Sequence, residues 1–491
     1  MKKLSLKGAS ADAVLLTCIK LVSIFLGLAV TRLLSEYLSV HEYGTYSQIM
    51  LLVSTVSSIT ILGMMDGVSY FFNREHENDT RDAYIATIFA LQCLVSTIAG
   101  LLIMLLVNPI CQYFDNSAVA PLMIFAAGLP FLQNLMFMSQ VLFVSIGKAR
   151  LLAFRNLAIS LVRFAAVLVI VWVVQSAKVF LIASTILDIA QIIFFWAVLR
   201  KNSFRLRWRL VCPRLLKEIL HYCVPMAVYI VINTLNRDMD KYLISMMTDT
   251  ETLAVYTNAS KQLPFDILVT SFCTVLVPYI TRYISEQKKQ QAVNLYKSFL
   301  EIGYISTGIL CGAALAVAPQ LMKLLYSNKY IDGLWIFIIY IFVDLFRFAN
   351  ITLILSAAGK TRTLMFLGVG SLMCNAVLNV LLYQWLGLIG PAVATLLVTV
   401  ATGVIMLALG ARALDTDSLG FFNWKHLMLF VLESATLIAI LSFLRRVLEK
   451  QDVHYFFILV IVGGTYALTM LLLNGGKLCK AVKAVNGAAN D

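Results

Sequence analysis

Apolar segments of about 20 residues, separated by short polar breaks, recur along the whole chain. A helix of that length crosses about 30 Å of hydrocarbon. We therefore predict an all-α polytopic membrane protein with about 14 transmembrane helices. The expected spans lie near residues 11–34, 44–67, 83–107, 119–144, 156–174, 179–199, 219–247, 253–281, 299–322, 334–356, 363–383, 389–411, 425–444 and 454–473.

The composition supports a chain that lies in the bilayer throughout. Of its 491 residues, 60% are hydrophobic and only 13% are charged, whereas soluble domains carry about 25% charged residues. Lys2, Lys3 and Lys7 resemble the start of a signal peptide. The apolar stretch behind them is too long and contains Lys20, so we expect an uncleaved first span.

The net charge of +13 is explained by the distribution of basic residues. Lys and Arg concentrate in the two tails and in every second loop, as in loops that stay in the cytoplasm. This predicts a multi-pass membrane protein with both termini cytoplasmic. Nucleic acid is not expected as a partner.

Signals for metal or nucleotide chemistry are weak. The nine cysteines form no CxxC pair and the five histidines lie far apart, so no metal site is predicted. Gly359-Lys360-Thr361 ends like a phosphate-binding loop, but Ile354 stands where that motif needs glycine. We expect no cofactor, and uphill transport would draw on an H⁺ or Na⁺ gradient, the membrane potential or a partner. The short external loops argue against a membrane polymerase or other enzyme.

An internal repeat organises the chain. Five matches follow one another at an offset of about 210 residues: Gly44-Thr45-Tyr46 with Ala254-Val255-Tyr256, Pro109 with Pro319, Gly147-Lys148-Ala149-Arg150 with Gly359-Lys360-Thr361-Arg362, Trp172 with Trp385, and Arg200 with Arg412. We infer a duplicated six-helix unit. Since six is even, both copies have the same orientation, and a cleft between two lobes is expected.

The repeat predicts four parts. An N-terminal lobe covers residues 1–200, and a basic cytoplasmic linker covers 201–218. A C-terminal lobe covers 219–412. Two further spans and a basic tail cover 413–491.

Charges inside spans are the main functional candidates, because each is costly in hydrocarbon unless it faces protein or water. Arg237 and Lys241 are one turn apart and share a face of their span. Asp240 lies near that face, and we expect Asp238 to be turned away from it. The group is either a self-neutralising interfacial cluster or the cationic wall of an aqueous cavity.

Further bases lie in other spans without adjacent acids: Lys20, Arg32 and Lys261. Lys20 is about ten residues into its span, too deep for easy snorkelling, so we expect it to face a wet cavity. Arg32 is close enough to the outer edge to be either an interfacial anchor or part of the cavity.

The acids inside spans are candidates for ion coupling or for charge pairing. Asp344 and Arg347 lie three residues apart and are expected to pair. Asp66, Asp188 and Asp266 are lone acids, either sites for a coupling ion or partners of a base on another helix. Pro225, Pro264 and Pro278 predict kinks.

The chain resembles bacterial polysaccharide flippases of the Wzx type, within the multidrug/oligosaccharidyl-lipid/polysaccharide exporter superfamily. The resemblance covers nearly the whole chain and rests on four segments: Arg32-Leu33-Leu34, Glu42-Tyr43-Gly44-Thr45-Tyr46, Gly147-Lys148-Ala149-Arg150, and Asp240-Lys241 followed by Leu253 to Lys261. Ala254 stands where the family often has glycine.

The resemblance implies two lobes arranged as a V, with spans 1, 2, 7 and 8 lining a cavity and the last two spans peripheral. It places five bases on the cavity surface: Lys20, Arg32, Arg237, Lys241 and Lys261. The implied substrate is an oligosaccharide repeat unit on undecaprenyl pyrophosphate, flipped from the cytoplasmic to the outer leaflet for cell-surface polysaccharide biosynthesis. Membrane lipids, a polysaccharide polymerase and glycosyltransferases are the implied partners.

Two other functions remain open on the same fold. A cation-coupled drug antiporter would favour acids over bases in its cavity. A flippase for the lipid-linked peptidoglycan precursor would need the same cationic surface.

Overall fold

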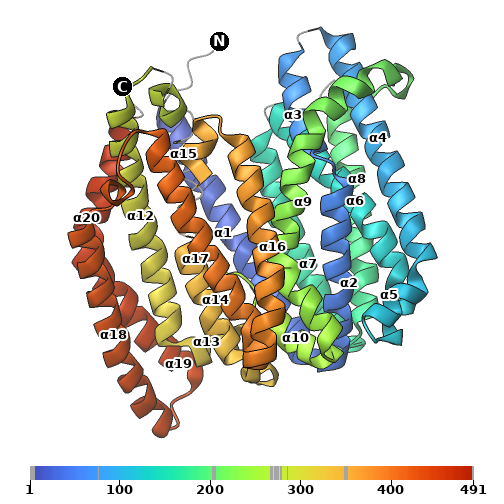
Figure 1. Ribbon diagram of the computed structural model, residues 1–491. Coiled ribbons are helices and arrows are strands. Elements are labelled where there is room, and N and C mark those ends of the chain that lie inside the picture. The colour runs from blue at the N-terminus through green and yellow to red at the C-terminus, as the bar shows by residue number, and fades with distance from the viewer. Residues whose placement is uncertain are drawn as a thin grey trace. The chain divides into compact units, whose positions relative to one another are not determined.

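The computed structural model describes residues 6–488, except 76, 147, 202–205, 266–268, 270–275, 277–278, 285 and 348–351. All regular structure in this described part is helical (Figure 1). Two compact units, residues 1–255 and 256–491, divide the chain. The prediction of an all-α polytopic membrane protein is confirmed.

Unit 1 begins with four helices and a short fifth: α1 (Leu6–Tyr37), α2 (Val40–Thr60), α3 (Met64–Arg74), α4 (Asn78–Leu105) and α5 (Val107–Tyr113). It continues with η1 (Ser117–Leu122), α6 (Met123–Ser145), α7 (Ala149–Val173), α8 (Ala177–Lys201), η2 (Trp208–Leu210), η3 (Pro213–Leu215) and α9 (Leu216–Met247), and it includes the start of α10 (Thr250–Ala259).

Unit 2 begins with α12 (Lys289–Ala316), α13 (Ala318–Tyr326), η4 (Asn328–Gly333), α14 (Leu334–Phe346) and α15 (Thr352–Ala357). It continues with α16 (Thr361–Leu386), η5 (Gly387–Ile389), α17 (Gly390–Ala413), η6 (Ser418–Phe421), α18 (Trp424–Lys450), α19 (Tyr455–Ile458), η7 (Leu459–Gly463) and α20 (Gly464–Ala488).

The helices follow the predicted spans closely. Within the described residues, nine stretches are long and apolar enough to cross a membrane, and one of them, Arg362–Ala413, contains both α16 and α17. A tenth appears if α2 and α3, which meet at a 41° bend, form one span. Gly63 permits this break, since its φ of +66° is strained for any other residue. The predicted number of fourteen is approximate.

The repeat is visible in the order and length of the elements. Helices α4 and α12 both contain 28 residues, and η1 and η4 both contain six. Each pair begins about 210 residues apart. The tryptophans Trp172 and Trp385 end α7 and α16 at equivalent points, and both are highly exposed. In a membrane such aromatic side chains contact lipid.

Expected span 8 departs from a continuous helix. The helix α10 ends at Ala259, and residues 260–265 are irregular. Pro264 explains this end, because proline lacks a backbone N–H and disfavours helix at the residue before it. The amide of Leu263 donates instead to Oδ2 of Asp344 on α14, at 3.0 Å. Irregular backbone at membrane depth needs such a buried partner.

Packing in each unit rests on interdigitated apolar side chains. In unit 1, the aromatic residues Phe71, Phe89, Phe143 and Phe195 are fully buried between α3, α4, α6 and α8. Lipid tails are as apolar as these side chains, so close van der Waals packing holds the helices together. In unit 2, α18 and α20 pack on α12 around the buried Tyr466.

Candidate functional site

The strongest concentration of charge within a span lies where α9 packs on α2. Arg237 Nη2 on α9 donates to Ser54 Oγ on α2 at 3.0 Å. Arg237 Nη2 also lies 2.8 Å from Oδ2 of Asp238, and Lys241 Nζ lies 2.8 Å from the other carboxylate oxygen. We call these four residues, Ser54, Arg237, Asp238 and Lys241, the Arg237 cluster.

Asp238 is the organising residue of this cluster. Its side chain is 7% exposed, whereas that of Lys241 is 15% exposed and that of Arg237 is 46% exposed. A carboxylate this deeply buried is tolerated because two cations bind it. The prediction that Asp238 turns away from the bases was therefore wrong. Helix position gives the direction of Cβ only, and the long Arg and Lys side chains reach back to the carboxylate.

The guanidinium of Arg237 keeps donors for a further anion. A guanidinium has five N–H donors, and here Nε and Nη2 serve Asp238 and Ser54. Among the described residues, Nη1 has no hydrogen-bond partner. A half-exposed guanidinium with two such N–H groups, fixed by buried partners on two helices, suits a phosphate oxygen.

A hydroxyl network next to the cluster locks α9 against α2. The Tyr242 hydroxyl is hydrogen-bonded to Thr55 and donates to the carbonyl of Leu51 at 3.2 Å. The Tyr113 hydroxyl donates to the carbonyl of Tyr242 at 2.9 Å. Sequence reasoning missed these residues, and it missed Ser54, because uncharged hydroxyls carry no distinctive signal in a single span.

Of the other three predicted bases, Arg32 is the one whose pairing the structure describes within unit 1. Arg32 forms an ion pair with Glu36, one turn further along α1, so the expectation that it has no adjacent acid was wrong. The backbone of Lys20 lies in α1, but its side chain falls outside the described residues. Lys261 is exposed just after α10 and belongs to unit 2.

The acids expected as ion sites or pairing partners have different environments. Asp188 on α8 pairs with Arg163 on α7 at 3.1 Å and accepts from Gln191 at 2.9 Å, so it partners a base on another helix. Asp240 is buried and accepts from the Lys241 amide. Asp66 is half-buried on α3, and Asp266 lies outside the described residues.

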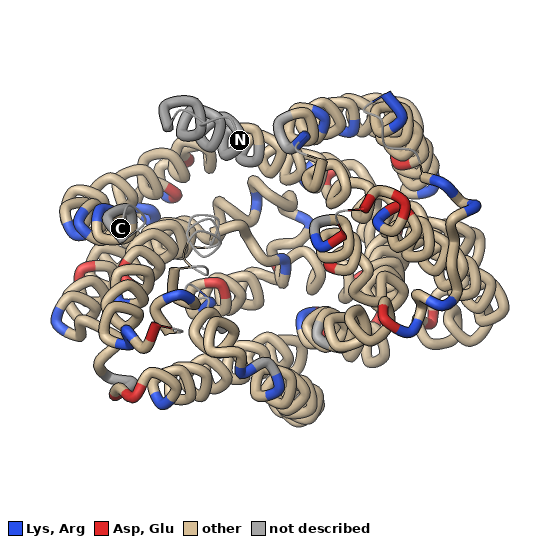
Figure 2. Tube along the Cα trace, turned by 90° about the horizontal axis from the view of Figure 1, so that it is seen from above, with Lys and Arg blue, Asp and Glu red and all other residues tan. Residues whose placement is uncertain are grey.

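We expected Asp344 and Arg347 to pair with each other, but the structure gives them different surroundings. Asp344 is buried and accepts the Leu263 amide proton, while Arg347 is exposed at the end of α14. The partner of Asp344 comes from a residue 81 positions away, which no local pattern could indicate. Figure 2 shows the general situation: most of the tube is tan, and blue and red positions adjoin at several points.

A second charged contact anchors the beginning of α9. Arg74, at the end of α3, pairs with Glu218 at 2.7 Å, and its guanidinium lies 4.8 Å from the centre of the Phe71 ring. The Tyr84 hydroxyl donates to the same Glu218 carboxylate. These contacts fix α9 to α3 and α4, and the Arg237 cluster fixes it to α2.

Comparison with known proteins supplies a family and a fold. The family model described as "Polysaccharide biosynthesis protein" matches residues 30–334. The lipid II flippase MurJ in an inward closed conformation superposes with a TM-score of 0.69 at 15% identity, covering 95% of this chain and 100% of that one. No curated protein sequence matches the chain significantly.

Two other solved transporters share the fold. The MATE multidrug transporter DinF-BH, solved as a complex, gives a TM-score of 0.61 at 12% identity and covers 84% of this chain and 96% of that one. A MOP-superfamily transporter from Pyrococcus furiosus, described as having reversed polarity in its binding pocket, gives 0.56 at 11% identity, with coverage of 82% and 94%.

Proposed function

The chain belongs to the polysaccharide biosynthesis protein family, and on that premise we propose that it flips undecaprenyl-pyrophosphate-linked oligosaccharide repeat units from the cytoplasmic to the outer leaflet. Alternating access would carry the unit across, for cell-surface polysaccharide biosynthesis. The polytopic helical fold and its likeness to the MurJ flippase support transport of a lipid-linked substrate. Two of the structural neighbours are described as a flippase and a multidrug transporter, which supports transport rather than catalysis.

The Arg237 cluster is the observation that carries the proposal. A pyrophosphate diester bears about two negative charges, and removing their water is costly without fixed counter-charges. We assign Arg237 as the residue that contacts the headgroup, because its guanidinium is half-exposed and Nη1 is available. Asp238 and Ser54 hold that guanidinium in place. Lys241 is largely buried against Asp238. The positive charges of Lys241 and Arg237 outnumber the single negative charge of Asp238, so the Arg237 cluster is net positive; the neighbouring Asp240 is not part of it.

The remaining predicted bases extend this proposal. Lys20, Arg32 and Lys261 are proposed to stabilise the headgroup or sugars at other stages of transport. Arg32 would first have to exchange its ion pair with Glu36 for one with the substrate. Coupling to H⁺ or Na⁺ is proposed through the acids named above, with Asp238 as the first candidate, since its protonation would release Lys241.

Two observations favour alternative substrates. The likeness to MurJ supports a peptidoglycan precursor on the same lipid carrier, which has the same pyrophosphate and would use the same cluster. The likeness to MATE transporters supports a cation-coupled exporter of small molecules. An exposed arginine at the cluster favours an anion over an organic cation.

The test is leaflet-resolved flipping in proteoliposomes that contain the purified full-length protein. We expect an undecaprenyl-pyrophosphate-linked oligosaccharide to cross only when protein is present. The assay is run both with and without an imposed H⁺ or Na⁺ gradient. Lipid II and a small fluorescent organic cation are assayed in parallel. Export of the organic cation without movement of any lipid-linked sugar would overturn the proposal in favour of a drug antiporter.

A further inference from the structure

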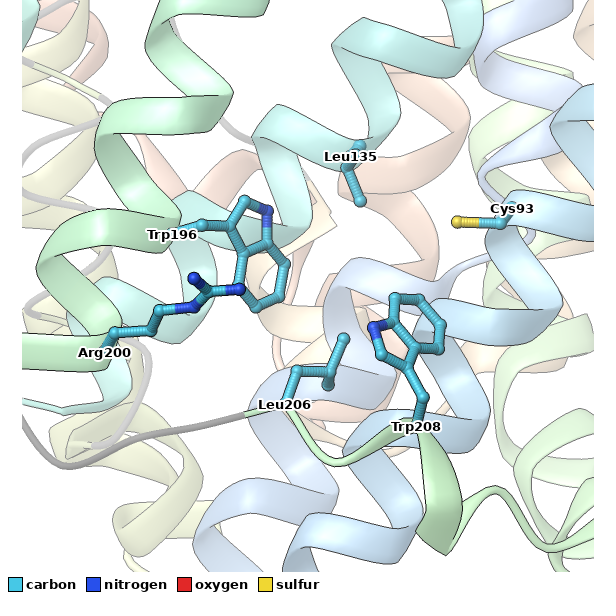
Figure 3. Close-up of a pocket in the computed structure, with 6 residues that line it drawn as sticks. All are labelled: Cys93, Leu135, Trp196, Arg200, Leu206 and Trp208. Carbon is cyan, nitrogen blue, oxygen red and sulfur yellow. The ribbon is translucent and has the colours of Figure 1, made fainter.

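A pocket in unit 1 lies away from the Arg237 cluster, between α4, α6, α8 and the segment that leads to α9. Its volume is about 590 Å³, and its lining residues are Cys93, Leu135, Trp196, Arg200, Leu206 and Trp208. Figure 3 shows the two indole rings on different sides of the pocket, with the Arg200 guanidinium close to Trp196. None of these residues takes part in the proposed transport site.

The pocket is preformed by contacts behind its walls. Trp196 packs edge-on against Phe89, with ring centres 5.3 Å apart. The segment that bears Trp208 is fastened to α4 on both sides: Arg207 binds Asp79 at 2.7 Å, and the Cys212 amide donates to Thr87 Oγ1 at 3.0 Å. A ligand would therefore find both indoles already in position, which reduces the ordering cost of binding.

The electrostatics select an anion. Arg207 is engaged by Asp79 and Asp82, but among the residues that the structure describes, no carboxylate lies within ion-pair distance of Arg200. Lys201 and Arg209 are exposed close to it along the chain. The two indole N–H groups are donors only. The polar part of the pocket thus offers positive charge and donors.

The surroundings select an amphiphile. Large exposed apolar side chains lie one and two turns from Trp196 on the same face of α8: Ile193 and Ile189. In a multi-pass membrane protein such side chains face acyl chains. Tryptophan and arginine are the residues that bridge apolar and headgroup regions at the membrane interface. The volume is in the range of small-molecule sites, about 300–1,000 Å³.

We propose that this pocket binds the phosphate headgroup of an anionic membrane phospholipid, with Arg200 as the phosphate ligand and Trp196 and Trp208 as its walls. The acyl chains would lie along the exposed apolar residues of α8. Bound lipid joins α8 to the segment that connects it with α9. This lipid is a resident one, so the inference stands whatever substrate the protein transports.

Native mass spectrometry of the full-length protein, exchanged into phosphatidylglycerol or phosphatidylcholine, tests the proposal. We expect wild type to retain one more phosphatidylglycerol molecule than Arg200→Gln does. The variant should bind phosphatidylglycerol about tenfold more weakly, because a charge-assisted hydrogen bond is lost. Arg412→Gln is the matched control. Arg412 occupies the last turn of α17, as Arg200 occupies that of α8, and is exposed.

Further arms keep the test decisive. Arg200→Lys keeps the charge and should retain most of the binding, while Trp208→Ala, which loses both the wall and the N–H donor, should weaken it more than Trp208→Phe does. Phosphatidylglycerol should raise the unfolding temperature of wild type and Arg412→Gln but not that of Arg200→Gln. The proposal fails if Arg200→Gln binds phosphatidylglycerol as Arg412→Gln does, if phosphatidylcholine binds equally, or if undecaprenyl phosphate displaces phosphatidylglycerol from this site.

Discussion

Arg237 on α9 donates a hydrogen bond to Ser54 on α2, 183 residues earlier in the chain, at 3.0 Å. This contact ties the one half-exposed guanidinium of the Arg237 cluster to a neighbouring helix. It also explains why a charged side chain is tolerated here: the guanidinium binds both a buried carboxylate and a hydroxyl.

The buried carboxylate should be coupled energetically to Lys241. Asp238→Asn is expected to lower the free energy of unfolding by about 1–3 kcal/mol, since it removes the acceptor that two cations share. Lys241→Met alone leaves Asp238 bound to Arg237 and should cost less. In the double variant the two effects should be less than additive. Detergent unfolding curves of the four proteins measure this, and strict additivity would show that the pair is not coupled.

Gly44 lies where the beginnings of α2 and α10 approach each other closely, which leaves no room for a side chain. A Cβ at this position would lie 2.3 Å from the carbonyl oxygen of Thr250. We expect Gly44→Ala to lower stability by about 1–3 kcal/mol through overpacking. Gly128 on α6 has nothing within 4 Å of its Cβ position, so Gly128→Ala is the control and should be neutral or slightly stabilising. Equal melting temperatures for both variants would contradict this packing.

Asp249 should make the stability of α10 dependent on pH. Its carboxylate accepts the Thr252 amide proton at 2.7 Å, and this bond lowers the pKa of Asp249. The contribution is therefore complete above the unfolded pKa of about 3.9, and it disappears as the pH falls through the lower folded pKa. Asp249→Ala should cost about 0.5–2 kcal/mol at pH 7.

The matched variant for this hydrogen bond is Asp249→Asn. Asp249→Asn keeps a hydrogen-bond acceptor without the charge, so it should keep most of the stability at pH 7. The contribution of residue 249 to stability should then no longer change between pH 7 and pH 3. Thermal unfolding at both pH values measures the effect. An unchanged pH dependence in Asp249→Asn would mean that the carboxylate is not the titrating group.

Asp344 should hold the irregular segment after α10. Asp344→Ala leaves the buried Leu263 amide without its acceptor, and we expect a loss of about 1–3 kcal/mol together with faster hydrogen exchange at Leu263. Asp344→Asn retains a carbonyl oxygen and should exchange more slowly than the alanine variant. Identical exchange at Leu263 in all three proteins would show that Asp344 does not support this segment.

The helices could be predicted from the sequence because hydrocarbon leaves few alternatives to a helix. Hydrophobic runs located the spans, and the matches around Pro109 and Pro319 or Trp172 and Trp385 located the repeat. The partners of charged residues were harder. Glu36, one turn from Arg32, was within reach of a local rule, but Ser54 for Arg237 and Leu263 for Asp344 depend on packing between distant helices.

The direct test of the central claim is the initial rate of flipping of an undecaprenyl-pyrophosphate-linked oligosaccharide at low substrate concentration, for wild type, Arg237→Lys, Arg237→Gln and Arg446→Gln. Arg446 is exposed on α18 and serves as the control for loss of one positive charge. If Arg237 holds the headgroup, Arg237→Gln should be about 10- to 100-fold slower, Arg237→Lys intermediate and Arg446→Gln unchanged. Equal rates for Arg237→Gln and Arg446→Gln, in proteins of equal stability, would contradict the claim.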